Sequence, residues 1–128
     1  ENCYSSGDIS AIGGGNVGSI VGKIDKGKLT VKNCVAWNTM LISTDKTKIG
    51  RIVGGTTNAI YENCYAYDGM ILKAGETTFT VSDEASPTGS SFQGVAKSAN
   101  ELKSTVISWD SSLWKEGNNG YPVFKWSK

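Results

Sequence analysis

The apolar positions of this sequence lie in short runs of a few residues, which glycine and polar turns separate. Examples are the runs VGSIVG at 17–22, KNCVAW at 32–37 and ENCYAY at 62–67. These runs are too short for helices and are rich enough in β-branched residues to favour strands. The alternating stretch GETTFTV at 75–81 predicts a further strand.

The same pattern recurs with a period of about 30 residues. Cys34 follows Cys3 by 31 residues, and Cys64 follows Cys34 by 30. An asparagine precedes each cysteine, and a second block repeats as VGSIVG at 17–22 and IGRIVG at 49–54. A period in this range is typical of stacked structural units, none of which can bury its apolar face alone.

We therefore expect an all-β fold: a short right-handed parallel β-solenoid of about three coils. Stacking places like residues in columns, which explains why they repeat. Cysteine is expected in one interior column as a small apolar side chain, and asparagine at a corner, where its amide bonds to the coils above and below. Glycine is expected where the chain turns or two backbones approach closely.

The last third of the chain departs from the repeat. The stretch at 82–91 is typical of a surface loop, and Ser98 with Glu101 three residues later predicts a helix beginning at Ser98. The turn GNNGYP and a closing strand VFKW follow. We expect a C-terminal cap with one short helix that plugs the open end of the solenoid with aromatic side chains. These side chains belong to Trp109, Trp114, Tyr121, Phe124 and Trp126.

This pattern predicts a single domain over 1–128. The repeats occupy 1–72, an irregular last coil and loop occupy 73–97, and the cap occupies 98–128. Because the first residue already lies inside a repeat, we expect the chain to be a fragment of a longer secreted protein with neighbouring domains.

Composition narrows the possible functions. Thirteen basic and twelve acidic residues give a net charge of +1, so no electrostatic argument favours nucleic acid or an anionic membrane. No apolar run is long enough to insert into a membrane. The chain has three cysteines and no histidine, which removes the commonest general base and the usual zinc ligand. We expect buried thiols, no metal and no cofactor, with a disulfide or a metal role for the cysteines as the alternatives.

The two repeat blocks and their spacers resemble the GLUG repeat, in which a VGGLVG-like block precedes the pattern IENCYA. The closing segment, from AKSANELKS to GYPVFKW, resembles the stretch that often follows the last GLUG repeat in secreted proteins of gut Bacteroides-type bacteria. Ser19 and Arg51 depart from the pattern, because each replaces the second glycine of its block. Val35 is a further departure, since the family usually has tyrosine at this position. The resemblance implies an extracellular or cell-surface bacterial protein of the adhesin-like or IgA-peptidase-associated kind.

Strand alternation predicts a candidate binding surface. If Cys34 points inward, Trp37 points outward, and the same alternation turns Tyr65 and Tyr67 outward beside Cys64. Trp37 and Tyr67 hold equivalent positions in adjacent coils, so we expect an exposed aromatic pair, supported by Tyr65, that suits a sugar ring or a protein partner. The alternative is that the loop at 43–48 or a neighbouring domain covers it.

We expect a non-catalytic adhesion or spacer module that recognises a host or dietary glycan or a surface protein. The alternative is a fragment of a carbohydrate-active β-helix enzyme, a polysaccharide lyase or glycoside hydrolase. Such a hydrolase needs two carboxylates facing one groove. Asp8 and Asp68 lie at similar positions two coils apart, but Asn38 and Thr39 fill the place between them. The pair Asp83 and Glu84 is expected on a surface loop.

Overall fold

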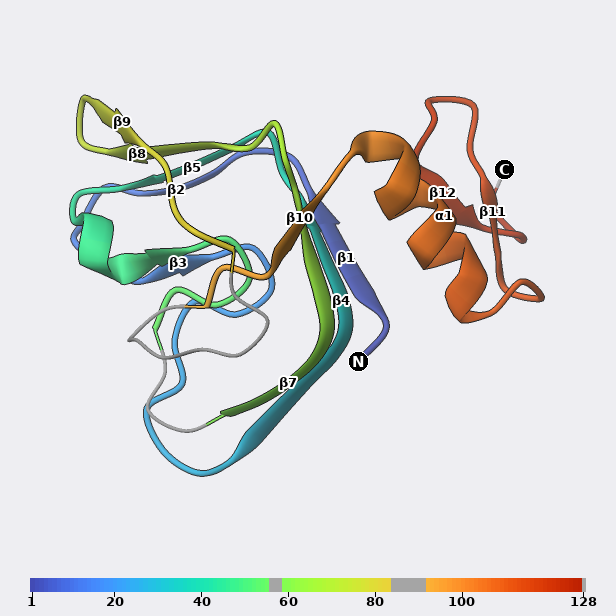
Figure 1. Cartoon of the computed structure of the whole chain (residues 1–128), viewed down its shortest axis with the longest axis horizontal. Coiled ribbons are helices and arrows are strands. Elements are labelled where there is room, and N and C mark those ends of the chain that lie inside the picture. Colours follow the sequence, from blue (N-terminus) through green and yellow to red (C-terminus); the bar gives the residue numbers. More distant parts are fainter. Residues whose placement is uncertain (56–58, 84–91, 128) are drawn as a thin grey trace.

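The computed structural model describes residues 1–55, 59–83 and 92–127, which form strands of two to nine residues and one α-helix (Figure 1). The largest sheet, here the first sheet, has the order β1-β4-β7-β10, and all of its strands are parallel. Its strands are β1 (Cys3–Ser6), β4 (Leu29–Trp37), β7 (Ala59–Tyr67) and β10 (Val95–Lys97). Strands from successive repeats are thus direct neighbours in one sheet, as the repeat predicts.

Two further sheets are built from the same repeats. The second sheet has the order β2-β5-β8-β9, in which only β9 is antiparallel to its neighbour. The third sheet pairs β3 with β6 in parallel. Their strands are β2 (Ile9–Ala11), β5 (Met40–Ser43), β8 (Ile71–Ala74), β9 (Thr77–Phe79), β3 (Val17–Gly18) and β6 (Ile49–Gly50), and a 3-10 turn, η1 (Lys46–Lys48), precedes β6.

The register of the first sheet confirms the phase of the repeat. Cys3 lies opposite Cys34, and Cys34 lies opposite Cys64. The asparagine before each cysteine has positive φ, between 49° and 56°, a conformation that asparagine tolerates better than most residues. Their amides form a ladder along the stack: Asn33 donates to Asn2 over 2.9 Å, and Asn63 donates to Asn33 over 3.2 Å. The predicted asparagine column is therefore present.

Apolar side chains from the three sheets meet in the interior. One cluster joins residues of the first sheet to the bridged residues Val21, Val53 and Phe92, and a second joins the second and third sheets. The most buried members are Cys34, Ala36, Ile52, Val53, Ala66, Phe92, Leu41, Ile49 and Leu72. Gly50 has no room for a side chain, because an added Cβ would lie 2.8 Å from the carbonyl carbon of Val53 and 2.9 Å from the Phe92 oxygen. The repeated glycines thus allow the close approach of backbones.

The three thiols are free and do not share one environment. Cys34 and Cys64 are buried, as expected, whereas Cys3 is exposed because β1 ends the sheet. The expectation that all three cysteines are buried is therefore wrong for Cys3. The adjacent Cys34 thiol, together with burial, raises the pKa of Cys64, so the Cys64 thiol stays protonated and poorly reactive near neutral pH.

Arg51, which replaces a glycine of the repeat block, is buried, and its charge is paired. Its guanidinium donates to the carbonyl oxygens of Gln93 and Gly94 over 2.9 and 2.7 Å, and forms an ion pair of 2.6 Å with Asp83. The side-chain oxygen of Gln93 in turn accepts the Arg51 backbone N–H. Arg51 therefore fixes the segment around Gln93 against the middle repeat.

The C-terminal segment contains α1 (Ala99–Trp109) and an antiparallel pair, β11 (Trp114–Glu116) and β12 (Pro122–Phe124). The helix begins as predicted, because the Ser98 side chain accepts the Glu101 N–H while the Glu101 carboxylate accepts the Ser98 N–H. The closing strand is shorter than predicted and ends at Phe124. Of the expected loop at 82–91, residues 84–91, including Glu84, lie outside the described residues.

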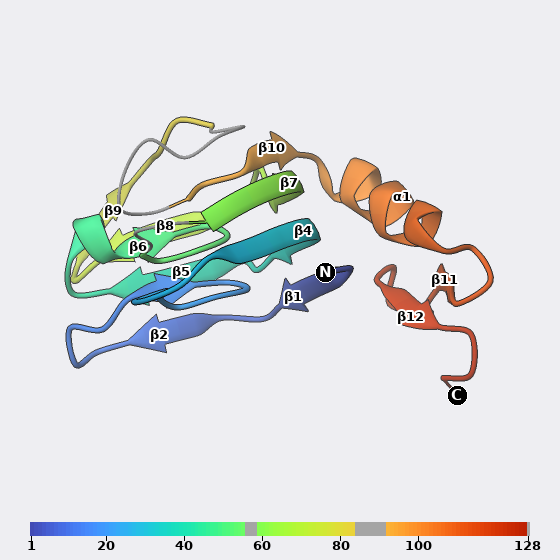
Figure 2. The same ribbon diagram turned by 90° about the horizontal axis from the view of Figure 1, so that it is seen from below.

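This segment does not plug an end of the stack, so that expectation is wrong. Figure 2 shows α1, β11 and β12 beside the first sheet. The cluster that joins them to the sheet contains Val35 and Trp37 of β4 together with Leu102 and Val106 of α1. The outward side chains Val35 and Trp37 of β4 are apolar, so covering them with α1 removes apolar surface from water.

Candidate functional site

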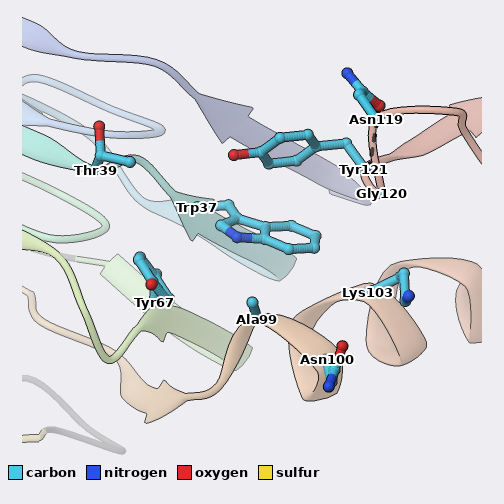
Figure 3. A pocket seen from close by; sticks show the side chains of 9 residues that line it. All are labelled: Trp37, Thr39, Tyr67, Ala99, Asn100, Lys103, Asn119, Gly120 and Tyr121. Atoms are coloured by element: carbon cyan, nitrogen blue, oxygen red, sulfur yellow. Dashed lines mark hydrogen bonds between the residues drawn. The ribbon is translucent and has the colours of Figure 1, made fainter.

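A groove opens where the C-terminal segment meets the first sheet (Figure 3). Its volume is about 320 Å³, within the size range of small-ligand sites. Three parts of the fold contribute: the carboxyl ends of β4 and β7, the first turns of α1, and the turn before β12. The lining residues are Trp37, Thr39, Tyr67, Ala99, Asn100, Lys103, Asn119, Gly120 and Tyr121.

Aromatic rings form much of the groove wall. Trp37 ends β4, where alternation turns its indole away from the interior, and Tyr67 has the corresponding place at the end of β7. The Tyr121 ring lies 4.7 Å from the Trp37 ring at 57°. Trp37 is only 6% exposed, because α1 and the turn before β12 cover most of it. The indole position is thus fixed by packing before any ligand arrives.

Polar groups lie around these rings. Asn100 and Asn119 contribute amides, and Thr39 a hydroxyl that donates to Asp8 over 2.5 Å. Lys103 is the one charged lining residue, and its ammonium forms an ion pair of 2.8 Å with Glu116. The groove therefore offers neutral donors and acceptors next to ring faces, a combination suited to hydroxyl-rich ligands.

The structure brings together two of the three predicted site residues. Trp37 and Tyr67 both line the groove. The expectation that Trp37 is exposed is wrong, because the chain's own C-terminal segment covers it, rather than the loop at 43–48. Tyr65 lies elsewhere, beside a separate hollow, where the Lys97 ammonium sits 4.5 Å from the centre of its ring.

Sequence reasoning missed the contribution of the C-terminal segment to the groove. Tyr121 was expected only as part of a cap, and Asn100, Lys103 and Asn119 were not singled out. The turn GNNGYP carried a partial signal, since it combines amides with an aromatic residue. Its position against Trp37 depends on how α1 docks, which no local pattern specifies.

No carboxylate lines this groove, although Asp8 and Glu116 bond to two of its lining residues. None of its lining residues is acidic, and the buried polar side chains of the described ranges are Ser19, Asn38, Ser43, Arg51 and Gln93. Asp8 is held by Thr39, and Asp68 donates its backbone N–H to the Lys97 carbonyl. In the same ranges, no cluster of three or more cysteine or acidic side chains is arranged to hold a metal ion.

The helix α1 is too short and too polar to cross a membrane, and the described part of the chain contains no helix that could.

Comparison with known proteins gives one informative likeness. No protein-family model matches the chain, and no curated protein matches it either. A solved structure from Bacteroides ovatus, described as a "putative immunoglobulin A1 protease", superposes with a TM-score of 0.83 at 49% sequence identity. The match covers 89% of this chain but only 34% of that protein. The chain is therefore similar to about one third of a larger bacterial protein.

Proposed function

We propose that this chain is a non-catalytic module of an extracellular or cell-surface bacterial protein, built as a short right-handed β-solenoid of the GLUG type. In three sheets, strands from successive repeats pair in parallel, which supports the solenoid interpretation. The likeness to part of a Bacteroides protein named as an immunoglobulin A1 protease supports an extracellular bacterial setting with neighbouring domains. In this proposal the module supplies adhesion or spacing, and any cleavage belongs to another domain.

The groove is the proposed recognition site, and its ligand is a glycan. The observation that carries this proposal is the fixed set of Trp37, Tyr67 and Tyr121 beside the amides of Asn100 and Asn119. Sugar rings have apolar faces that lie well against aromatic rings, and hydroxyls that bond to amides. The ion pair of the one lysine with a glutamate leaves the lining without an unpaired charge, which favours a neutral sugar.

A glycan array with the purified chain tests this proposal. Tyr67→Ala removes one wall of the groove and should abolish the signal. The matched control is Tyr65→Ala, which removes the same side chain two residues earlier on β7 but outside the groove. Binding that both variants retain would move the site elsewhere, and binding that both lose would point to a disturbed strand. A parent chain that binds no glycan would refute the proposal.

A protein partner is the second candidate, and the neighbour's name identifies one to test. Immunoglobulin A1, with and without enzymatic removal of its glycans, can be passed over the immobilised chain and the same two variants. Binding that survives removal of the glycans and is lost in Tyr67→Ala would assign the groove to protein recognition. Cleavage of the immunoglobulin by this chain alone would refute the non-catalytic proposal.

The carbohydrate-active enzyme remains the alternative from a different class. It is disfavoured because no carboxylate lines the groove or stands among the buried polar side chains of the described residues. Incubating the chain with pectic and other polysaccharides, and measuring new reducing ends and unsaturated products, distinguishes the two. Activity that depends on Asp8 or Asp68 would establish the enzyme.

A further inference from the structure

The two ends of the sheet stack are built differently. At one end, all three sheets finish with strands from the first twenty residues: β1, β2 and β3. Figure 2 shows β1 and β2 at the same end of the stack. At the other end, the first sheet finishes with β10 and the second with β9. We call these the β1 end and the β10 end.

The β10 end is closed by the chain itself. Strand β9 folds back antiparallel on β8, which ends the parallel pairing of the second sheet. Phe92 is 1% exposed and forms an antiparallel bridge with Val53, whose carbonyl accepts the Phe92 N–H over 2.9 Å. Strand β10 also carries Lys97, and a lysine on an edge strand discourages further pairing.

The β1 end has no comparable protection among the described residues. Its three edge strands read CYSS, ISA and VG, with no charged residue and no proline. Natural sheets usually protect edges with such residues, with bulges or with a covering segment. Ile12, just after β2, is 87% exposed, and Cys3 is exposed although its two column partners are buried.

The asparagine ladder gives this end a direction. Each amide donates to the asparagine of the preceding repeat, so Asn2 accepts from Asn33. The Asn2 amide nitrogen has no such acceptor within the described residues, although a further asparagine stacked on it would supply one.

A hollow of about 390 Å³ lies beside Asn2, between Tyr4 on one side and Trp114 and Phe124 on the other. Its wall is mostly apolar side chains, beside an open strand edge.

We propose that the β1 end is a docking surface for a parallel strand from a further coil of this same repeat, with its asparagine over Asn2 and its cysteine or other small residue over Cys3. Backbone bonds to β1 would supply affinity, and the hollow beside Tyr4 would accept an outward apolar side chain of the incoming strand. The register continues the one that already joins β1, β4 and β7. In the similar Bacteroides protein, the matched part makes up 34% of the length, so that protein contains further chain beyond it.

Thiol trapping tests both the docking and its register. The probe is a synthetic peptide with the sequence of residues 29–43, LTVKNCVAWNTMLIS, whose cysteine is activated as an aryl disulfide. If it docks as proposed, its cysteine lies opposite Cys3, and residues opposite each other in a sheet are close enough for a disulfide. The Cys3 thiolate then attacks the peptide sulfur and releases the aryl thiolate, whose absorbance reports the rate.

The control peptide exchanges the activated cysteine with the valine that follows it, which turns the disulfide to the opposite face. We expect the first peptide to react roughly tenfold faster or more, because docking raises the effective concentration of its disulfide beside Cys3. Mass spectrometry should locate the bond at Cys3. Hydrogen exchange should show protection of the amides of β1 when the first peptide binds, also in a Cys3→Ser variant that cannot be trapped.

Equal rates for the two peptides, or unprotected β1 amides, would overturn the proposal. A second copy of this chain is the competing occupant, and analytical ultracentrifugation of the chain alone decides that case. A concentration-dependent dimer that Cys3–Cys3 crosslinking captures would also overturn the proposal, because the occupant would then be the chain itself. A monomer with the expected peptide reaction would support it. None of these readouts depends on glycan binding.

Discussion

Replacing Gly50 with alanine tests the explanation of the glycine repeat. Gly50 pairs with Gly18 in the third sheet and lies buried against the bridge between Val53 and Phe92. An added Cβ would lie 2.8 Å from the Val53 carbonyl carbon, 2.9 Å from the Phe92 oxygen, and nearer still to the Val53 oxygen. All three are backbone atoms, so no side-chain rotation can relieve the overlap.

The cost follows from what must move. The Val53 oxygen accepts the Phe92 N–H, and the Phe92 oxygen accepts the N–H of Ile52 over 3.1 Å. Displacing these carbonyls weakens two buried hydrogen bonds, at about 1 kcal/mol each and more if a group is left unpaired. Overpacking a close-packed interior costs about 1–3 kcal/mol. We therefore expect Gly50→Ala to lower the free energy of unfolding by ~3–5 kcal/mol, a large fraction of what a small domain has.

Urea denaturation followed by tryptophan fluorescence measures this loss. The matched control is Gly13→Ala, where an added Cβ would meet nothing within 4 Å and where φ is not positive. That exposed change should leave the free energy of unfolding within about 0.5 kcal/mol of the parent. If Gly50→Ala also unfolds within about 1 kcal/mol of the parent, close backbone approach is not why this glycine repeats.

Three further substitutions follow from the packing and the hydrogen bonds. Leu102→Ala should lower the free energy of unfolding by ~2–5 kcal/mol and shift tryptophan emission to the red, because α1 loosens from the sheet. Ser104→Ala, on the exposed side of α1, should do neither. Thermal unfolding and emission spectra measure both effects. Asn33→Ala should destabilise the fold by ~1–2 kcal/mol more than Asn33→Gly. Both variants lose the amide ladder, but only alanine is strained at the φ of 49° that this position adopts. Equal urea midpoints for the two variants would refute this explanation. The Arg51 guanidinium lowers the pKa of Asp83 in the folded protein. The stabilisation from this pair is therefore present above the ordinary pKa of 3.8 and is lost as pH falls through the lower folded value. Asp83→Asn should remove this part of the acid dependence, which urea titrations at several pH values measure.

The sequence was sufficient to predict features that arise from the pairing of neighbouring repeats. The phase of the cysteines predicted the pairing of Cys3, Cys34 and Cys64, and the asparagine before each one predicted the amide ladder. The helix start at Ser98 followed from a capping pattern three residues long. These features depend on short-range geometry or on strict repetition, and both are visible along a chain.

The position of the C-terminal segment could not be predicted in the same way. Its aromatic residues suit the end of a stack as well as they suit the side of a sheet, and composition does not distinguish the two. Contacts between residues far apart in the sequence place this segment at the side. For example, the Tyr4 hydroxyl donates to the Pro122 carbonyl over 2.6 Å, although the two residues lie near opposite ends of the chain. The pairing of Arg51 could not be predicted either, because its partners Gln93 and Asp83 lie more than thirty residues away in the sequence.

The covering of the first sheet separates residues that hold the fold from residues available for binding. The carboxyl end of β4 is buried on both sides, since Ala36 faces the interior and Val35 faces the C-terminal segment, each with no exposed surface. The groove lies at the edge of this covered area, where Tyr67 remains partly exposed. A substitution under the cover, such as Leu102→Ala, should therefore change stability and binding together. Tyr67→Ala should remove binding at a smaller cost in stability, because Tyr67 is only partly buried, so comparing the two variants distinguishes a real site from a disturbed fold.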